Sequence, residues 1–123
     1  MGVVYERAQE WAKARDWILP AIDYGHGTHN EDDILIRILS GEYKLWLFEK
    51  SAVVTNMIQW PQFKAFNVAM AGGDMEDLKS HQCEMERWAV AQGCKQACSG
   101  GRDGWGRVFP EYKRAGVLYF KDL

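Results

Sequence analysis

The sequence predicts a single α/β domain, residues 1–123, in which helices flank a mixed, twisted β-sheet in the order α-α-β-β-β-α-β-α-β. Apolar residues recur with a helical period before residue 40, alternate between residues 43 and 70, and recur helically again after residue 74. A helix that follows one strand and leads to the next implies a parallel crossover, which makes the sheet mixed. A length of 123 residues suits one domain with a useful core.

Two helices are expected first. Residues 4–19 are rich in helix formers and carry apolar residues at roughly helical spacing, and Pro20 is expected to stop that helix. Residues 31–39 form the second helix, whose acidic first turn suits the helix dipole. Either Thr28 or Asn30 can cap its N-terminus.

Three strands linked by short turns then form an antiparallel meander. Alternation places Trp46 and Phe48 on one face of the sheet and Leu45 and Leu47 on the other, so both faces are apolar. One face is expected to lie under a later helix, and the other under the first two helices or under another subunit. The predicted strands are residues 43–49, 51–60 and 63–70.

A long helix over residues 75–92 begins after the N-cap Asp74 and should turn Leu78, Met85 and Trp88 toward the sheet. The remaining elements are a short strand, a short helix and a final strand, which bring the sheet to five or six strands. Their predicted bounds are residues 95–99, 105–114 and 117–123.

Composition excludes several classes of function. The net charge is −2 without clustered Lys or Arg, which argues against nucleic-acid binding. The chain has no apolar run of about 18 residues and no signal-peptide pattern, so a cytoplasmic protein is expected, in a host cytoplasm or virion if a phage encodes it.

No metal site is expected. The three cysteines are an odd number without a secretory signal, so reduced thiols are the default. His26 and His29 form a His-x-x-His pattern on a loop, but no third ligand stands nearby. His81 is expected on the solvated flank of the long helix.

The order of elements resembles the GNAT acyltransferase fold over roughly residues 4–123. Three local motifs carry the resemblance: Glu86-Arg-Trp-Ala with Gly93-Cys94 at the end of the central helix, Gly101-Arg-Asp-Gly-Trp105 in the following loop, and Tyr112-Lys-Arg-Ala-Gly116 in the family's Tyr-containing turn. More loosely, the chain resembles small uncharacterised proteins of bacteriophages and prophages.

The segment before the central helix departs from this family. GNAT proteins bind the pyrophosphate of acetyl-CoA with a Gly-rich turn at a helix N-terminus, and here Gly72 and Gly73 come too early for that turn. Three carboxylates stand there instead: Asp74, Glu76 and Asp77. At ~5 Å and an effective dielectric of ~20 each repels an anion by about 3 kcal/mol, against about 1 kcal/mol from the helix dipole. We therefore expect CoA not to bind in the usual way.

Two functions remain open. The degenerate loop favours a non-catalytic, GNAT-like phage or prophage protein that acts through protein contacts and has no cofactor. The alternative is an acyl-CoA-dependent N-acetyltransferase with acetyl-CoA as cofactor and Tyr112 as general acid. In that alternative the cofactor-binding residues are Val68, Ala69, Met70, Ala71, Gly72 and Gly73.

The aromatic content predicts a protein interface. Six Trp, five Tyr and five Phe are more aromatic surface than a small core readily hides. Trp60 at a strand end and Trp105 in a Gly-rich loop are expected to be exposed anchors. We therefore expect a homo-oligomer or a stable protein partner.

Overall fold

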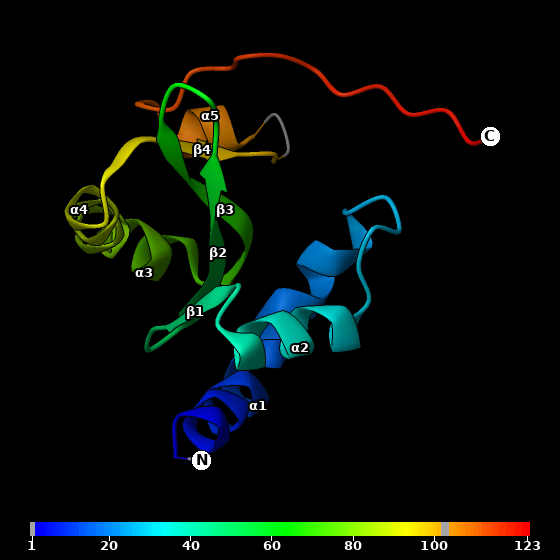
Figure 1. Cartoon of the computed structure of the whole chain (residues 1–123), viewed down its shortest axis with the longest axis vertical. Helices are drawn as coiled ribbons and strands as arrows, with labels where there is room; N and C mark the ends of the chain where they lie inside the picture. The colour runs from blue at the N-terminus through cyan, green and yellow to red at the C-terminus, as the bar shows by residue number, and fades with distance from the viewer. Residues whose placement is uncertain (1, 102–103) are drawn as a thin grey trace.

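The computed structural model describes residues 2–101 and 104–123. In these residues the elements are α1 (Gly2–Asp23), α2 (Glu31–Ser40), β1 (Lys44–Leu47), β2 (Ser51–Gln59), β3 (Lys64–Gly73), α3 (Met75–Ser80), α4 (Gln82–Ala91), β4 (Cys94–Ser99) and α5 (Trp105–Val108). The strands form one sheet in the order β1-β2-β3-β4, in which β1, β2 and β3 are antiparallel neighbours and β4 runs parallel to β3. Figure 1 shows α1 and α2 on one side of this sheet and α3 and α4 on the other.

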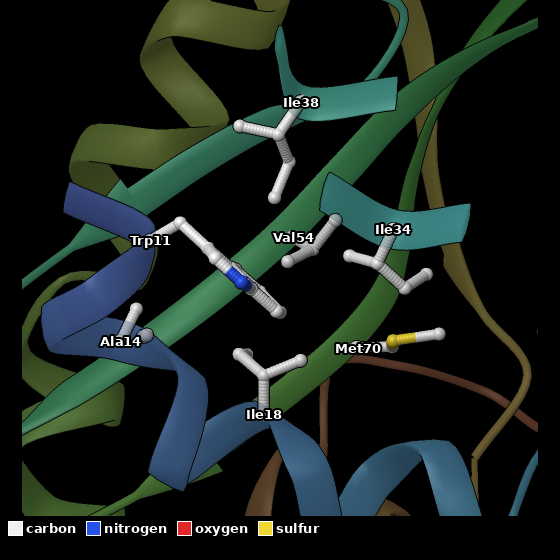
Figure 2. Packing of buried hydrophobic residues seen from close by; sticks show 8 residues of the cluster. Trp11, Ala14, Ile18, Ile34, Ile38, Val54 and Met70 are labelled. Carbon is white, nitrogen blue, oxygen red and sulfur yellow. The ribbon is translucent and has the colours of Figure 1, made fainter. Parts of the chain in front are cut away.

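Both faces of the sheet are apolar, as predicted, and the first two helices cover the face that the sequence left open. Leu45 and Leu47 pack against the cluster formed with α1 and α2, whereas Trp46 and Phe48 pack against the cluster formed with α3 and α4. The first cluster is drawn in Figure 2 and includes Trp11, Ala14, Ile18, Ile34, Ile38, Val54 and Met70. The mixed, helix-flanked α/β architecture is therefore confirmed.

Helix α1 continues past Pro20, where the sequence predicted its end, and stops at Asp23. Proline removes one backbone hydrogen bond in a helix interior, but Ala21 and Ile22 pack against the first core cluster. Burial of this last turn outweighs the lost bond, since tertiary packing supplies most helical stability in proteins.

Helix α2 begins as predicted at a capped N-terminus, and Asn30 is the cap. The Asn30 side chain accepts a hydrogen bond from the backbone N–H of Asp33 at 2.9 Å, and the Asp33 carboxylate accepts one from the backbone N–H of Asn30 at 2.9 Å. This reciprocal capping box satisfies two N–H groups that the helix itself leaves unpaired.

The helix predicted over residues 75–92 is instead two helices, α3 and α4, that meet at His81. The Ser80 hydroxyl donates to the Asp77 carbonyl at 2.6 Å, a back-bonding arrangement that bends helices. The residues predicted to face the sheet do so: Leu78 and Met85 are buried, and Trp88 packs against the same cluster.

The end of the chain differs most from the sequence prediction. The helix expected to reach residue 114 ends at Val108, because Pro110 lacks a backbone N–H and disfavours a helical conformation at Phe109, whose φ is −121° and ψ 76°. Residues 117–123 join no strand ladder, so the described residues form a four-stranded sheet rather than one of five or six strands.

Candidate functional site

The segment predicted to align a cofactor, Val68–Gly73, is the second half of β3. One of its edges pairs with β2 as far as Gly73. On the other edge, β4 accompanies β3 only up to Val68, which pairs with Ser99. Within the described part of the chain, residues 69–73 therefore have a partner strand on one side only.

Both glycines of this segment are required by packing. A Cβ atom at Gly72 would lie 1.9 Å from the backbone oxygen of Trp17, so β3 and α1 approach each other at backbone distance. Gly73 has a φ of +108°, and a Cβ atom there would lie 2.4 Å from the backbone oxygen of Lys50. These contacts account for glycine at both positions through the close approach of β3 to α1 and to the β1–β2 turn.

The N-terminus of α3 is closed by the protein's own groups. The Asp74 carboxylate accepts a hydrogen bond from the backbone N–H of Asp77 at 3.0 Å, as predicted for an N-cap. The backbone N–H of Asp74 donates to the carbonyl of Lys50 at 2.8 Å. The start of α3 is thereby tied to the turn between β1 and β2.

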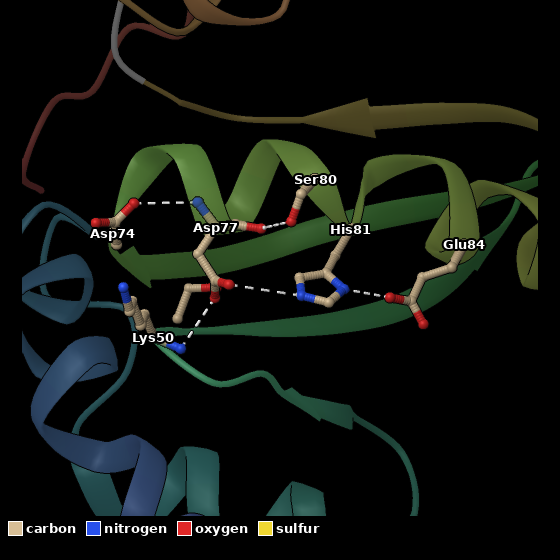
Figure 3. Close-up of polar contacts among 7 residues, drawn as sticks. Lys50, Asp74, Asp77, Ser80, His81 and Glu84 are labelled. Carbon is tan, nitrogen blue, oxygen red and sulfur yellow. Dashed lines mark hydrogen bonds and ion pairs between the residues drawn. The ribbon is translucent and has the colours of Figure 1, made fainter.

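The Asp77 carboxylate turns toward the same β1–β2 turn (Figure 3). Its Oδ2 accepts hydrogen bonds from the backbone N–H of Lys50 at 3.0 Å and from the Ser51 hydroxyl at 2.8 Å. These bonds, the Ser51 bond foremost, lower the pKa of Asp77 below its ordinary value. Since Ser51 is fully buried, this carboxylate satisfies a hydroxyl that water cannot reach.

His81 lies between two carboxylates rather than on a solvated flank, so its predicted placement is wrong. Its Nε2 is 3.7 Å from Asp77 Oδ1, its Nδ1 contacts the Glu84 carboxylate, and its side chain is 28% exposed. The ring stacks on Phe48 with centroids 3.8 Å apart and planes at 1°.

This group lacks the arrangement of a hydrolase. In such enzymes the histidine stands between the hydroxyl and the carboxylate, whereas here Asp77 stands between Ser51 and His81. Ser51 has no exposed surface on which a substrate could meet it. The group therefore links α3 and α4 to the β1–β2 turn and offers no nucleophile.

Tyr112, the predicted general acid, lies in the turn after α5. Its hydroxyl donates to Glu86 Oε2 at 3.5 Å, and the same oxygen accepts a shorter bond of 2.8 Å from the Gln82 side chain. Burial, and after it the charge of Glu86, raises the pKa of Tyr112 to about 12. Its proton is held more tightly than that of an ordinary tyrosine.

Two polar residues of the Asp77 group, Ser51 and His81, were not predicted as members of a common site. The spacing of Asp77, His81 and Glu84 along a helix was an available signal, since residues three and four apart are neighbours on a helix surface. No local pattern could have indicated Ser51, which is 26 residues from Asp77.

The two predicted aromatic anchors differ in exposure. Trp60 is 49% exposed, in agreement with the prediction. Trp105 is half-buried, packs against the α3–α4 core cluster, and stacks on Phe109 with centroids 5.5 Å apart. The prediction for Trp105 is therefore wrong. Arg102 and Asp103 of the adjoining loop lie outside the described residues.

Hollows in the surface lie elsewhere. One of about 620 Å³ borders the α1–α2 loop, and one of about 70 Å³ lies beside Trp88. Neither is lined by Tyr112 or by residues 68–73. Among residues 2–101 and 104–123, no three His, Cys, Asp or Glu side chains are grouped to hold a metal ion. His29 instead contacts Thr28 and the Tyr43 hydroxyl.

Comparison with known proteins gives a fold likeness alone. No protein-family model matches the chain, and no curated protein sequence matches it. The crystal structure of a point mutant of TTHA1254 from Thermus thermophilus is similar, with a TM-score of 0.56 and 14% sequence identity over 79% of this chain and 84% of that one. No helix in the described part of this chain is long and apolar enough to span a membrane.

Proposed function

We propose that this chain is a GNAT-like protein without catalytic activity that acts through protein contacts, in keeping with its resemblance to small phage and prophage proteins. The observation that carries the proposal is the state of the α3 N-terminus. Carboxylates of the chain itself, Asp74 and Asp77, stand where an acetyl-CoA pyrophosphate would have to bind, and both are hydrogen-bonded into the structure.

The electrostatics of this end of α3 oppose a bound anion. Asp77 is ionised at neutral pH, since its ordinary pKa of 3.8 is well below 7 and its hydrogen bonds to Ser51 and Lys50 lower that pKa further. Glu76 lies beside it and is exposed. These negative charges would repel a pyrophosphate at the start of α3. The backbone N–H of Asp77 could not donate to it either, because that group already donates to the Asp74 carboxylate.

Tyr112 is poorly matched to general acid catalysis. A general acid works best when its pKa lies near the working pH. The Tyr112 hydroxyl, with a pKa of about 12, is a weaker acid than a free tyrosine. Transfer of its proton to a departing thiolate, whose conjugate thiol has an ordinary pKa of about 8.5, would therefore be unfavourable.

An acyl-CoA-dependent N-acetyltransferase is the second candidate, and one feature of β3 favours it. On the side where β4 ends, no strand of the described residues lies beside residues 69–73. An extended ligand could pair with that backbone edge, as a peptide adds to an open sheet edge. Such a ligand would have to bind without help from the α3 N-terminus.

Calorimetric titration of the full chain with acetyl-CoA distinguishes the two candidates. The non-catalytic proposal predicts no heat beyond dilution up to millimolar acetyl-CoA. Micromolar binding would overturn it in favour of the enzyme. A Tyr112→Phe variant serves as a control on such binding, because a proton donor acts in the chemical step and its loss should leave affinity unchanged.

A further inference from the structure

The last seven residues, 117–123, form an exposed apolar segment that we name the apolar tail. Its largest side chains are strongly exposed: Val117 55%, Leu118 77%, Tyr119 90% and Phe120 57%. Beyond α5 the tail runs toward the α1–α2 loop (Figure 1), where Phe120 stacks on His26 with centroids 4.1 Å apart. Four consecutive large apolar residues on the surface of a soluble domain indicate a surface that is covered by something else.

The composition of the tail suits a β-strand. Val117, Tyr119 and Phe120 are of the residue types enriched in strands. Figure 1 shows the tail as a drawn-out trace, and it joins no ladder with the other described residues of its chain. The apolar tail is therefore a segment suited to strand pairing that has no partner strand among the described residues of its own chain.

The sheet provides an unused acceptor. Strand β4 is the last in the sheet order, and among the described residues β3 is its one partner strand, which leaves the backbone groups of its outer edge without a strand partner. Proteins commonly protect such edges with proline or several charges. Over Cys94–Ser99 there is no proline, and Lys95 is the one charged residue.

We propose that the apolar tail of one copy of this chain adds to the outer edge of β4 in a second copy, and that the exchange is reciprocal. The inference rests on the proposed function, because it identifies a second copy of this chain as the protein that it contacts. A two-fold exchange provides each tail with a sheet edge and each β4 edge with a strand, and it closes without free ends.

Charge complementarity fixes the direction. An antiparallel tail places Asp122 opposite Lys95, at the start of β4, whereas a parallel tail separates these two charges. In the same register Phe120 lies opposite Ala97, which packs against the α3–α4 core cluster. Tyr119 then lies opposite Cys98.

A second copy is a better acceptor than the chain's own β4. The tail follows α5 away from β4, and its Phe120 is held at His26 in the α1–α2 loop. Pairing with either copy releases the Phe120–His26 contact, so the choice of a second copy rests on the direction of the tail, which leads away from its own β4 edge.

Light scattering of the full chain after size-exclusion chromatography tests the association. We expect twice the mass of one chain across the micromolar range. The double variant Leu118→Lys, Phe120→Lys should have the mass of one chain. The matched control Ile36→Lys, Val90→Lys removes two equally exposed apolar side chains outside the tail and should remain dimeric. A wild-type monomer, or a dimer that survives the tail variant, overturns the proposal.

Disulfide formation tests the register. In a Cys83→Ser, Tyr119→Cys chain, mild oxidation should link two copies through Cys98, and adding Cys98→Ser should abolish the covalent dimer. A disulfide formed within one chain would show that the tail folds back on its own β4 and would overturn the exchange. Absence of any disulfide in a dimeric sample would overturn the antiparallel pairing.

These outcomes are separate from those of the acetyl-CoA titration. A monomer that does not bind acetyl-CoA refutes the strand exchange and leaves the non-catalytic proposal standing. A dimer that binds acetyl-CoA at micromolar concentration refutes the non-catalytic proposal, whatever joins the two copies.

Discussion

Substitution of Gly72 by alanine tests whether the glycines at the end of β3 serve packing. The new Cβ atom would lie 1.9 Å from the backbone oxygen of Trp17, about 1.5 Å short of the 3.4 Å at which ordinary contact begins. The Cβ atom is fixed to the backbone of β3 and the oxygen belongs to the backbone of α1, so no flexible side chain can move to relieve the clash. The sheet and α1 must therefore separate.

The size of the effect follows from what that separation disturbs. Helix α1 provides Trp11, Ala14 and Ile18 to the core cluster that β3 completes with Met70. Overpacking in a core costs typically 1–3 kcal/mol and occasionally more. Because this contact is between two backbones, we expect Gly72→Ala to lower the free energy of unfolding by about 3 kcal/mol or more, at the upper end of that range.

Urea denaturation followed by tryptophan fluorescence measures the change. Gly100→Ala is the matched control, because nothing lies within 4 Å of a Cβ atom at Gly100. Its effect should stay within about 0.5 kcal/mol, as for surface substitutions in general. A Gly72→Ala chain as stable as the wild type would refute the packing argument, and the more so if that chain had lost affinity for acetyl-CoA.

Three further substitutions address the caps and the two candidate site groups. Asn30→Ala should reduce the free energy of unfolding by about 1 kcal/mol through loss of the α2 cap. Asp32→Ala should reduce it by less, about 0.3 kcal/mol, through loss of one acidic group at the α2 N-terminus. Chemical denaturation measures both changes, and equal effects would contradict the capping box. Asp77→Asn should lower the urea midpoint at neutral pH more than Glu76→Gln. Folding lowers the pKa of Asp77, so the ionised carboxylate contributes fully to the free energy of unfolding above the ordinary pKa of 3.8, and this contribution is lost as the pH falls below that value. A difference in urea midpoint between the two variants that persists in acid would count against the hydrogen bonds assigned to the Asp77 carboxylate. In an ultraviolet pH titration, Tyr112→Phe should remove the ionisation near pH 12, and loss of one near pH 10 would show an unperturbed phenol.

The sequence predicted the elements that depend on local patterns and on alternation along a strand. Trp46 and Leu45 separate onto opposite faces of the sheet because successive side chains of a strand alternate. Asn30 and Asp74 cap helices because their short polar side chains reach the N–H groups three residues later. These signals lie within a few residues of one another.

The errors arose where distant parts of the chain decide local structure. Helix α1 passes Pro20 because Ala21 and Ile22 of its last turn are partly buried against the first core cluster. The helix predicted over residues 75–92 is interrupted at His81, whose ring contacts Asp77 and stacks on Phe48, the residue directly after β1. A strand needs a partner as well as a suitable composition, and residues 117–123 have the composition without a partner in their own chain.

The same division applies to the candidate site. The carboxylates at the start of α3 could be identified from the sequence as an obstacle to an anion. The hydrogen bonds of the Asp77 carboxylate to Lys50 and Ser51 could not, because those residues precede Asp77 by 27 and 26 positions. The long-range hydrogen bonds show why Asp77 is part of the fold rather than an exposed charge.

The most direct test of the account is a residue-resolved titration with acetyl-CoA, followed in amide nuclear magnetic resonance spectra of the full chain at neutral pH. The central claim is that the N-terminus of α3 is closed by Asp74 and Asp77. It predicts that the amide resonances of Lys50, Asp77 and Leu78 keep their positions up to millimolar acetyl-CoA. Saturable shifts of these three resonances at micromolar ligand would show pyrophosphate binding at that helix end and would contradict the account.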